Sequence, residues 1–134
     1  MAKLRHFAIS VEDPEKAAKF YEQTFGMRRV AENDHPGATG VYVSDGVVNL
    51  ALLRYKTDVA AGEDRGKDYF GVHHFGFVVN DVKQAKDRIE ANGGTYLMGE
   101  KTKTGGFFEM KFKDPNGVIF DINDTGWRLK PEQE

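Results

Sequence analysis

The stretch from His6 to Gly26, HFAISVEDPEKAAKFYEQTFG, has a second version, HFGFVVNDVKQAKDRIEANGG, from His74 to Gly94. The two stretches align without a gap at a constant offset of 68 residues, and seven of their 21 positions are identical. Such internal similarity indicates a duplicated unit, and two copies are too few for a solenoid. The identical pairs are His6/His74, Phe7/Phe75, Val11/Val79, Asp13/Asp81, Ala17/Ala85, Glu22/Glu90 and Gly26/Gly94. The sequence therefore predicts two modules, each about half of the chain.

Each copy begins with a pattern that is typical of a β-strand followed by a helix. Large and small side chains alternate after each histidine, which places Phe7 on a core face and His6 on the opposite face. A helix is expected after Asp13, a helix-capping residue followed by Pro14, and a second helix after Asp81. Three strand-like runs follow each helix: Met27–Glu32, Thr39–Ser44 and Val47–Leu53 in the first copy, and Tyr96–Glu100, Gly106–Lys113 and Val118–Asn123 in the second.

These patterns predict an α+β fold built from two tandem βαβββ modules. We expect the modules to be related by pseudo-twofold symmetry and to form a curved sheet around a central groove. Residues 1–134 are expected to form a single domain. Within it, module one covers residues 3–54, a linker 55–69, module two 70–124 and a C-terminal tail 125–134.

The composition excludes several kinds of protein. None of the 134 residues is Cys, which excludes disulfides, iron–sulfur clusters, thiolate zinc sites and a cysteine nucleophile. The 19 basic and 21 acidic residues give a net charge of -2 without a long run of either sign, unlike a nucleic-acid-binding or membrane-anchored protein. No apolar stretch approaches the ~20 residues of a membrane span, and no signal peptide is evident. A cytoplasmic protein without nucleic-acid or membrane partners is therefore expected.

Four residues at equivalent positions of the two modules are candidate metal ligands. His6 and His74 begin the duplicated stretch, and they would face a shared groove if the modules pack around a pseudo-twofold axis. Asn49 and Asp121 interrupt apolar runs in the last strand of each module. A buried charge or amide costs free energy unless it is paired or bound. We therefore predict that His6, His74 and Asp121 bind a divalent metal ion, with Asn49 as an optional further ligand.

For His6 or His74 taken alone, the alternative to a metal ligand is a structural histidine held by hydrogen bonds. The spacing of these residues matches no local metal-binding motif.

The sequence gives weaker support to the other candidate residues of the groove. Alternation in the run before the last turn puts Phe108, Met110 and Phe112 in the core and leaves Glu109 and Lys111 on the opposite face. Glu109 could orient substrate or act as a base, or be an exposed charge beside Lys111. Tyr42 could donate a hydrogen bond in the groove or pack, and Trp127 could cover a groove end or a dimer contact. His35 and His73 are expected to lie outside the site.

The paired modules and their motifs resemble the vicinal oxygen chelate superfamily. This superfamily includes glyoxalase I, fosfomycin resistance proteins, extradiol dioxygenases, methylmalonyl-CoA epimerase and bleomycin resistance proteins. The resemblance extends from about Lys3 to Asp124 and rests on His6 in LRHFAI, His74 in VHHFGF and Asp121 in DPNGVIFD. It implies metal positions on the first and last strands of each module, which are His6, Asn49, His74 and Asp121 here.

Two of these four positions depart from the pattern of the superfamily. Glyoxalases have Glu where this chain has Asn49, and most metal-binding members have Glu where it has Asp121. An amide lacks the charge and the proton-accepting capacity of a catalytic base, which argues against a glyoxalase I. The amide is closer to the epimerase, which has Gln at that position. The shorter Asp121 still coordinates metals, with less reach.

The resemblance implies a divalent-metal-dependent enzyme acting on a small substrate that chelates the metal through vicinal oxygens. The expected reaction is of the lyase or isomerase kind, or an extradiol-type dioxygenation, with Asp121, Glu109 and Tyr42 as candidate catalytic residues. One ion of Fe²⁺, Zn²⁺, Mn²⁺ or Ni²⁺ would suit the ligands. The alternative is a metal-free small-molecule-binding protein of the bleomycin-resistance type, whose members usually lack the two histidines. A homodimer is also expected, with each site inside one chain or shared between two.

Overall fold

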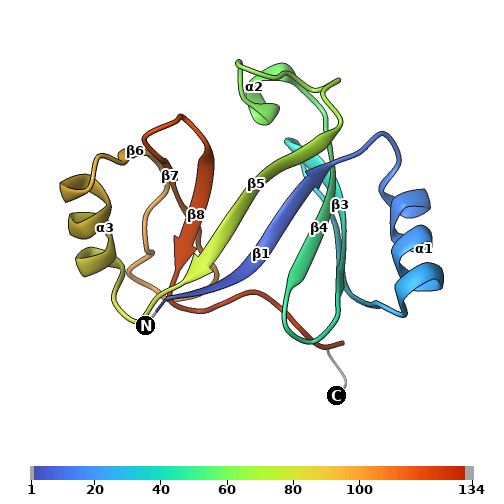
Figure 1. The fold of residues 1–134 in the computed structure, drawn as a ribbon. Helices are drawn as coiled ribbons and strands as arrows, with labels where there is room; N and C mark the ends of the chain where they lie inside the picture. The colour runs from blue at the N-terminus through green and yellow to red at the C-terminus, as the bar shows by residue number, and fades with distance from the viewer. Residues whose placement is uncertain (1, 132–134) are drawn as a thin grey trace. The chain divides into compact units, whose positions relative to one another are not determined.

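The computed structural model describes residues 2–131, so that residues 132–134 of the predicted tail lie outside the described residues (Figure 1). The chain divides into two compact units. Unit 1 contains the residues up to His6 together with His74–Trp127, and unit 2 contains Phe7–His73 together with the residues from Arg128 onward. Strands β1 (Lys3–Ser10) and β5 (Gly71–Val78) each run through both units.

Unit 2 carries the second half of β1 and the remaining elements of the first module. These are α1 (Pro14–Phe25), β2 (Arg28–Asp34), β3 (Ala38–Ser44) and β4 (Asn49–Tyr55). The strand order is β2-β3-β4-β1, and β2, β3 and β4 pair antiparallel. A short helix, α2 (Asp58–Ala61), follows β4 inside the segment that was predicted as a linker.

Helix α1 forms where the sequence predicts it. Its N-cap, Asp13, accepts hydrogen bonds from the backbone amides of Glu15 and Lys16 at 3.0 and 3.2 Å. The helix ends at Gly26, whose φ of 70° lies in the left-handed region that favours glycine. Ala18 of this helix is buried in a cluster with Val41 and Val43 of β3 and Leu52 of β4.

Unit 1 carries the first residues of β1 and the elements of the second module. These are β5, α3 (Val82–Ala91), β6 (Thr95–Met98), β7 (Met110–Lys113) and β8 (Ile119–Asn123). The strand order is β1-β5-β8-β7-β6; β5 and β8 are parallel, whereas β7 pairs antiparallel with both β8 and β6.

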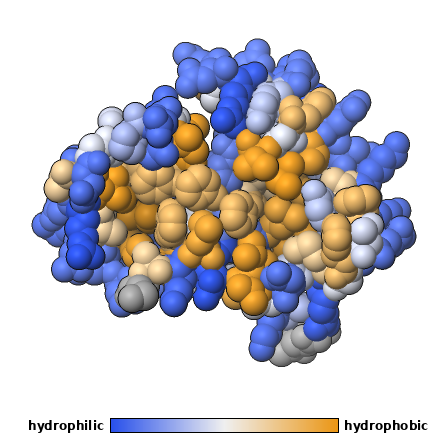
Figure 2. All heavy atoms as spheres, in the orientation of Figure 1, coloured by the Kyte–Doolittle hydropathy of each residue, from blue (hydrophilic) through white to orange (hydrophobic). Residues whose placement is uncertain are grey.

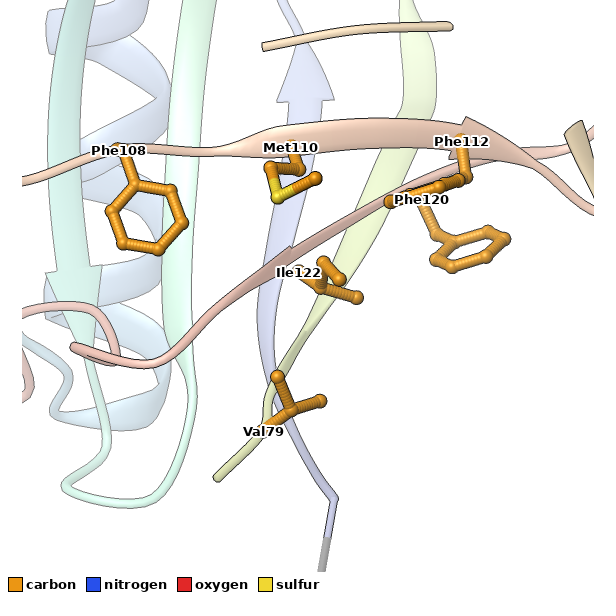
Figure 3. Close-up of a cluster of buried hydrophobic side chains, with 6 residues drawn as sticks. All are labelled: Val79, Phe108, Met110, Phe112, Phe120 and Ile122. Carbon is orange, nitrogen blue, oxygen red and sulfur yellow. The ribbon is translucent and has the colours of Figure 1, made fainter. Parts of the chain in front are cut away.

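The core of unit 1 is a cluster of buried side chains (Figure 3), against which Val82, Ala85 and Ile89 of α3 pack. Phe112 and Phe120 stack with their ring centroids 5.8 Å apart, and the buried cluster consists of Val79, Phe108, Met110, Phe112, Phe120 and Ile122. A cavity of about 390 Å³ remains beside this core, lined by Phe77, Ile122 and residues of α3. In Figure 2 the outer side of α3 is hydrophilic, whereas apolar side chains cover the neighbouring strands.

The two βαβββ modules are confirmed, as β1-α1-β2-β3-β4 and β5-α3-β6-β7-β8 (Figure 1). Two predicted strands of the second module are shorter than expected. β6 ends before Gly99, and β7 begins only at Met110, after Gly105 and Gly106. These three glycines have φ values of 90°, 82° and 92°, a conformation that interrupts an extended strand. Among the described residues, no helix is long and apolar enough to cross a membrane.

Candidate metal centre

Three predicted ligands come together inside unit 1. His6 lies on β1, His74 on β5 and Asp121 on β8, which are adjacent strands, and their side chains are only 3%, 4% and 0% exposed. Each offers a ligand atom within 4.8 Å of those of the other two. Asp121 Oδ2 is 3.2 Å from His74 Nε2 and 4.0 Å from His6 Nε2. The sheet thus gathers two imidazoles and a carboxylate at one buried point.

The two oxygens of the Asp121 carboxylate have different environments. Oδ1 accepts a hydrogen bond from Lys111 Nζ at 2.8 Å. Oδ2 is buried and accepts no hydrogen bond from any residue between 2 and 131. Burial would raise the pKa of Asp121, but His74 and the Lys111 ammonium outweigh burial and hold this pKa well below its ordinary value. Asp121 is therefore a charged carboxylate with one oxygen directed at the two histidines.

This arrangement fits a divalent cation. Metal bonds to imidazole nitrogen and carboxylate oxygen are about 2.0–2.2 Å long, which places neighbouring donor atoms roughly 3–4 Å apart. The distances from Asp121 Oδ2 to the two imidazoles fall in this range. A buried carboxylate oxygen without a hydrogen bond is costly by itself, and a bound cation would remove that cost.

Glu109 lies beside these three residues and is held there by Trp127. Trp127 Nε1 donates a hydrogen bond to Glu109 Oε2 at 2.9 Å, and the same oxygen is 3.8 Å from His6 Nε2. The indole also stacks on the His6 ring, with centroids 4.7 Å apart and planes 4° apart. Burial, together with the Asp121 charge, raises the pKa of Glu109 above its ordinary value. With 27% of its side chain exposed, Glu109 is a partly accessible carboxylate at the edge of the site.

Gly76 makes room for the stack of Trp127 on His6. A Cβ atom at this position would lie 2.8 Å from the Trp127 ring and 3.3 Å from His6 Cβ. Because real Cβ contacts are longer than the first of these distances, any larger residue would displace the indole.

Replacing Gly76 with Ala is therefore expected to move the indole and to lower the unfolding free energy by roughly 1–3 kcal/mol. Trp127 is the sole tryptophan of the chain, so its fluorescence reports on this site alone. The emission maximum should shift to longer wavelength as the ring becomes more exposed. Gly37→Ala, whose Cβ would lie no closer than 3.2 Å to its nearest neighbours, the exposed His35 ring and Ala60, serves as the control. An unchanged emission spectrum in Gly76→Ala would contradict this packing.

Asn49 and Tyr42, the other predicted site residues, belong to unit 2. Asn49 is buried on β4, and its Nδ2 donates to the carbonyl oxygen of Arg128 at 2.9 Å. The Tyr42 hydroxyl on β3 accepts a hydrogen bond from Asn33 Nδ2 at 3.0 Å. Metal ligation by Asn49 and a catalytic role of Tyr42 therefore stay predictions.

The two remaining histidines have surroundings unlike those of His6 and His74. His73 is buried in unit 2, where its Nε2 lies 2.6 Å from the carbonyl oxygen of Ala61. Its ring also packs on Tyr55, with centroids 4.8 Å apart. His35 is exposed in a turn and accepts a hydrogen bond from the backbone amide of Gly37.

Lys111 was not predicted to be part of the site, and Trp127 was predicted only as a residue that could cover a groove end or a dimer contact, without its contacts to His6 and Glu109. For Lys111 a signal was present, because a hairpin closed at Asp114–Gly117 pairs Lys111 with Asp121. For Trp127 no pattern was available, since it follows the last strand in a segment without regular structure.

Comparison with known proteins shows the family of this chain. Residues 3–122 match the model of the Glyoxalase/Bleomycin resistance protein/Dioxygenase superfamily. The chain belongs to this superfamily. The resemblance to the vicinal oxygen chelate proteins is thereby confirmed.

Relatives in this superfamily include proteins that are named as enzymes. Ethylmalonyl-CoA/methylmalonyl-CoA epimerase of Cereibacter sphaeroides is 28% identical over 133 residues, which cover 93% of this chain and 99% of that protein. A probable chloroplastic lactoylglutathione lyase of Arabidopsis thaliana is 26% identical over 96% of this chain, which spans only 37% of that protein's length. A solved structure of Streptomyces coelicolor methylmalonyl-CoA epimerase, in complex with 2-nitronate-propionyl-CoA, has a TM-score of 0.73. Its 22% identity covers 96% of this chain and 98% of that one, and the likeness shows the fold.

Proposed function

We propose that this protein is a divalent-metal-dependent isomerase or lyase that moves a proton on the carbon next to a carbonyl group of a small substrate. The observation that carries the proposal is the buried Oδ2 atom of Asp121, which faces two imidazole nitrogens and accepts no hydrogen bond from the described residues. Similarity to an acyl-CoA epimerase along nearly its whole length supports the isomerase kind of reaction. The proposed substrate is an acyl thioester that presents two neighbouring oxygens.

The residues that would hold the metal ion are His6 and His74 through Nε2 and Asp121 through Oδ2. Asn49 stays a predicted further ligand. A bound divalent cation supplies a Lewis acid that stabilises negative charge on a substrate oxygen. With His6, His74 and Asp121 as the ligands, positions on the cation would stay open for two substrate oxygens.

Glu109 is the proposed acid–base residue. Its carboxylate is partly exposed, and the Trp127 indole fixes one of its oxygens next to His6. A raised pKa makes the Glu109 carboxylate a stronger base than an ordinary carboxylate, which favours removal of a proton from carbon. Glu109 would take the proton from the α-carbon; a proton returned to the opposite face of the planar enolate would give the epimer, and loss of the proton held by Glu109 would restore the original protonation of the enzyme.

Solvent-deuterium exchange tests this proposal most directly. The protein is loaded with Zn²⁺, Co²⁺, Mn²⁺ or Ni²⁺ and incubated in D₂O with methylmalonyl-CoA, and mass spectrometry follows the α-proton. We expect exchange that EDTA abolishes. Absence of exchange, with oxygen uptake when catechols and Fe²⁺ are supplied, would instead support a dioxygenase. Failure to bind any metal would support the bleomycin-resistance type of binding protein.

Glu109→Gln is expected to reduce the exchange rate by about 100-fold or more, since a general base contributes that much to proton transfer. The amide oxygen can still accept the Trp127 hydrogen bond, so the stoichiometry of metal binding should not change. Glu100→Gln, at an exposed position of the same unit, is the matched control and should exchange at the normal rate. Normal exchange in the Glu109→Gln variant would show that Glu109 is not the base.

Homodimer formation and a cytoplasmic location also belong to this proposal. Sedimentation equilibrium of the purified protein tests the first, with a mass of twice 15.1 kDa as the expected result.

A further inference from the structure

Lys111 forms a hydrogen bond with Asp121, one of the candidate metal ligands. The two residues are opposite one another in the antiparallel pairing of β7 and β8, and Lys111 Nζ is 2.8 Å from Asp121 Oδ1. The Lys111 side chain is 24% exposed, so its ammonium lies at the boundary between the buried carboxylate and solvent. The β7–β8 pairing fixes the backbone of Lys111, and the charged Asp121 carboxylate holds its ammonium group by a hydrogen bond.

Because of the position of this ammonium, the two oxygens of the Asp121 carboxylate have different contacts. Oδ1 is used by Lys111, whereas Oδ2, which accepts no hydrogen bond from residues 2–131, faces His6 and His74. A carboxylate can bind a divalent cation through one oxygen or through both. Binding through both would require Oδ1 to leave the ammonium.

We propose that Lys111 is a positioning residue that restricts Asp121 to a single ligand oxygen, Oδ2. The inference rests on the proposed function, because it concerns the way in which the chain holds a divalent cation. A carboxylate that binds through one oxygen leaves a coordination position for substrate that a second oxygen would fill. Lys111 also places a positive charge next to the cation, which weakens cation binding and favours a substrate with anionic oxygens.

An ordinary structural ion pair has a different consequence. If Lys111 served only to neutralise Asp121 in the fold, its removal would lower stability, and the way in which a cation binds would not change. The coordination number of a bound cation therefore distinguishes the two roles, whereas stability does not, and affinity alone also responds to the loss of the Lys111 charge.

The test uses Zn²⁺ and Co²⁺ as probes with Lys111→Met, Lys111→Arg and Lys113→Met. Zn²⁺ affinity is measured by competition with a chromophoric chelator, and the visible spectrum of bound Co²⁺ reports the coordination number. We expect Lys111→Met to bind Zn²⁺ about tenfold more tightly, because a repelling charge is gone and a second oxygen is available. Its Co²⁺ band should weaken as the coordination number rises. Lys111→Arg, which keeps the charge and the donors, should resemble the unmodified protein.

Lys113→Met is the matched control, since Lys113 is also on β7, two residues further along, and pairs with Ile119. An equal gain in affinity in both Met variants would overturn the inference, as would Lys111→Met with unchanged or weaker Zn²⁺ binding. Failure of the unmodified protein to bind either ion would overturn the proposed metal centre itself. If Lys111→Met does not fold, Lys111→Gln removes the charge with a smaller change in polarity, and the same direction is expected.

Discussion

His74→Ala is expected to lower the affinity for Zn²⁺ by more than about 100-fold and to abolish metal-dependent exchange. Loss of a residue that merely orients a ligand costs 10- to 100-fold in metal affinity, and loss of a ligand should cost at least as much. The His74 imidazole is buried, with its Nε2 3.2 Å from Asp121 Oδ2, so its removal takes away one of the three ligand groups gathered at this point. Chelator competition measures the affinity, and circular dichroism checks the fold.

His35→Ala is the matched control for this prediction. His35 is exposed in a turn of unit 2, and its removal should leave Zn²⁺ affinity as it is. Zn²⁺ should raise the melting temperature of the control and of the unmodified protein, because a ligand that binds the native state stabilises it. A His74→Ala protein that keeps its Zn²⁺ affinity would show that His74 does not bind the metal.

Phe112→Ala is expected to lower the unfolding free energy by about 3–5 kcal/mol, a large share of the roughly 5–15 kcal/mol available to a domain of this size. Phe112 has no exposed surface and stacks on Phe120, in the core that supports the β7–β8 pairing (Figure 3). Truncation would leave a cavity directly behind the strands that carry Lys111 and Asp121. Urea denaturation, with the slope of the transition checked for two-state behaviour, gives the value.

Phe107→Ala provides the comparison for the core, since 60% of Phe107 is exposed on the segment before β7. Its unfolding free energy should change by less than about 1 kcal/mol. Equal losses in the two variants would contradict the assignment of Phe112 to the core.

Local patterns explain why much of the fold could be predicted. Asp13 and Asp81 cap helices because each follows a strand-like run and precedes a helical pattern, and both caps form. Alternation in the run before the last turn correctly placed Phe108, Met110 and Phe112 in the core. Helix α2 was missed because four residues are too few to show a helical period.

The candidate site could be predicted because its histidines lie at matching positions of the two modules; no short sequence motif contains them. His6 and His74 occupy the same position of the repeat, and the order β1-β5-β8 brings both next to Asp121. The contacts of Glu109 could not be predicted, because they depend on Trp127, which lies outside any regular element. Matching positions do not guarantee matching roles: Asn49 and Asp121 both lie on the last strand of their module, but they differ in charge and belong to different units.

We expect His6, His74 and Asp121 to bind one divalent cation together. Calorimetric titration of the EDTA-treated protein with Zn²⁺, alongside Asp121→Asn, tests it most directly. We expect one Zn²⁺ per chain with a raised melting temperature, and a large loss of affinity in Asp121→Asn. Less than about 0.1 equivalent of bound Zn²⁺, together with an unchanged melting temperature, would contradict it.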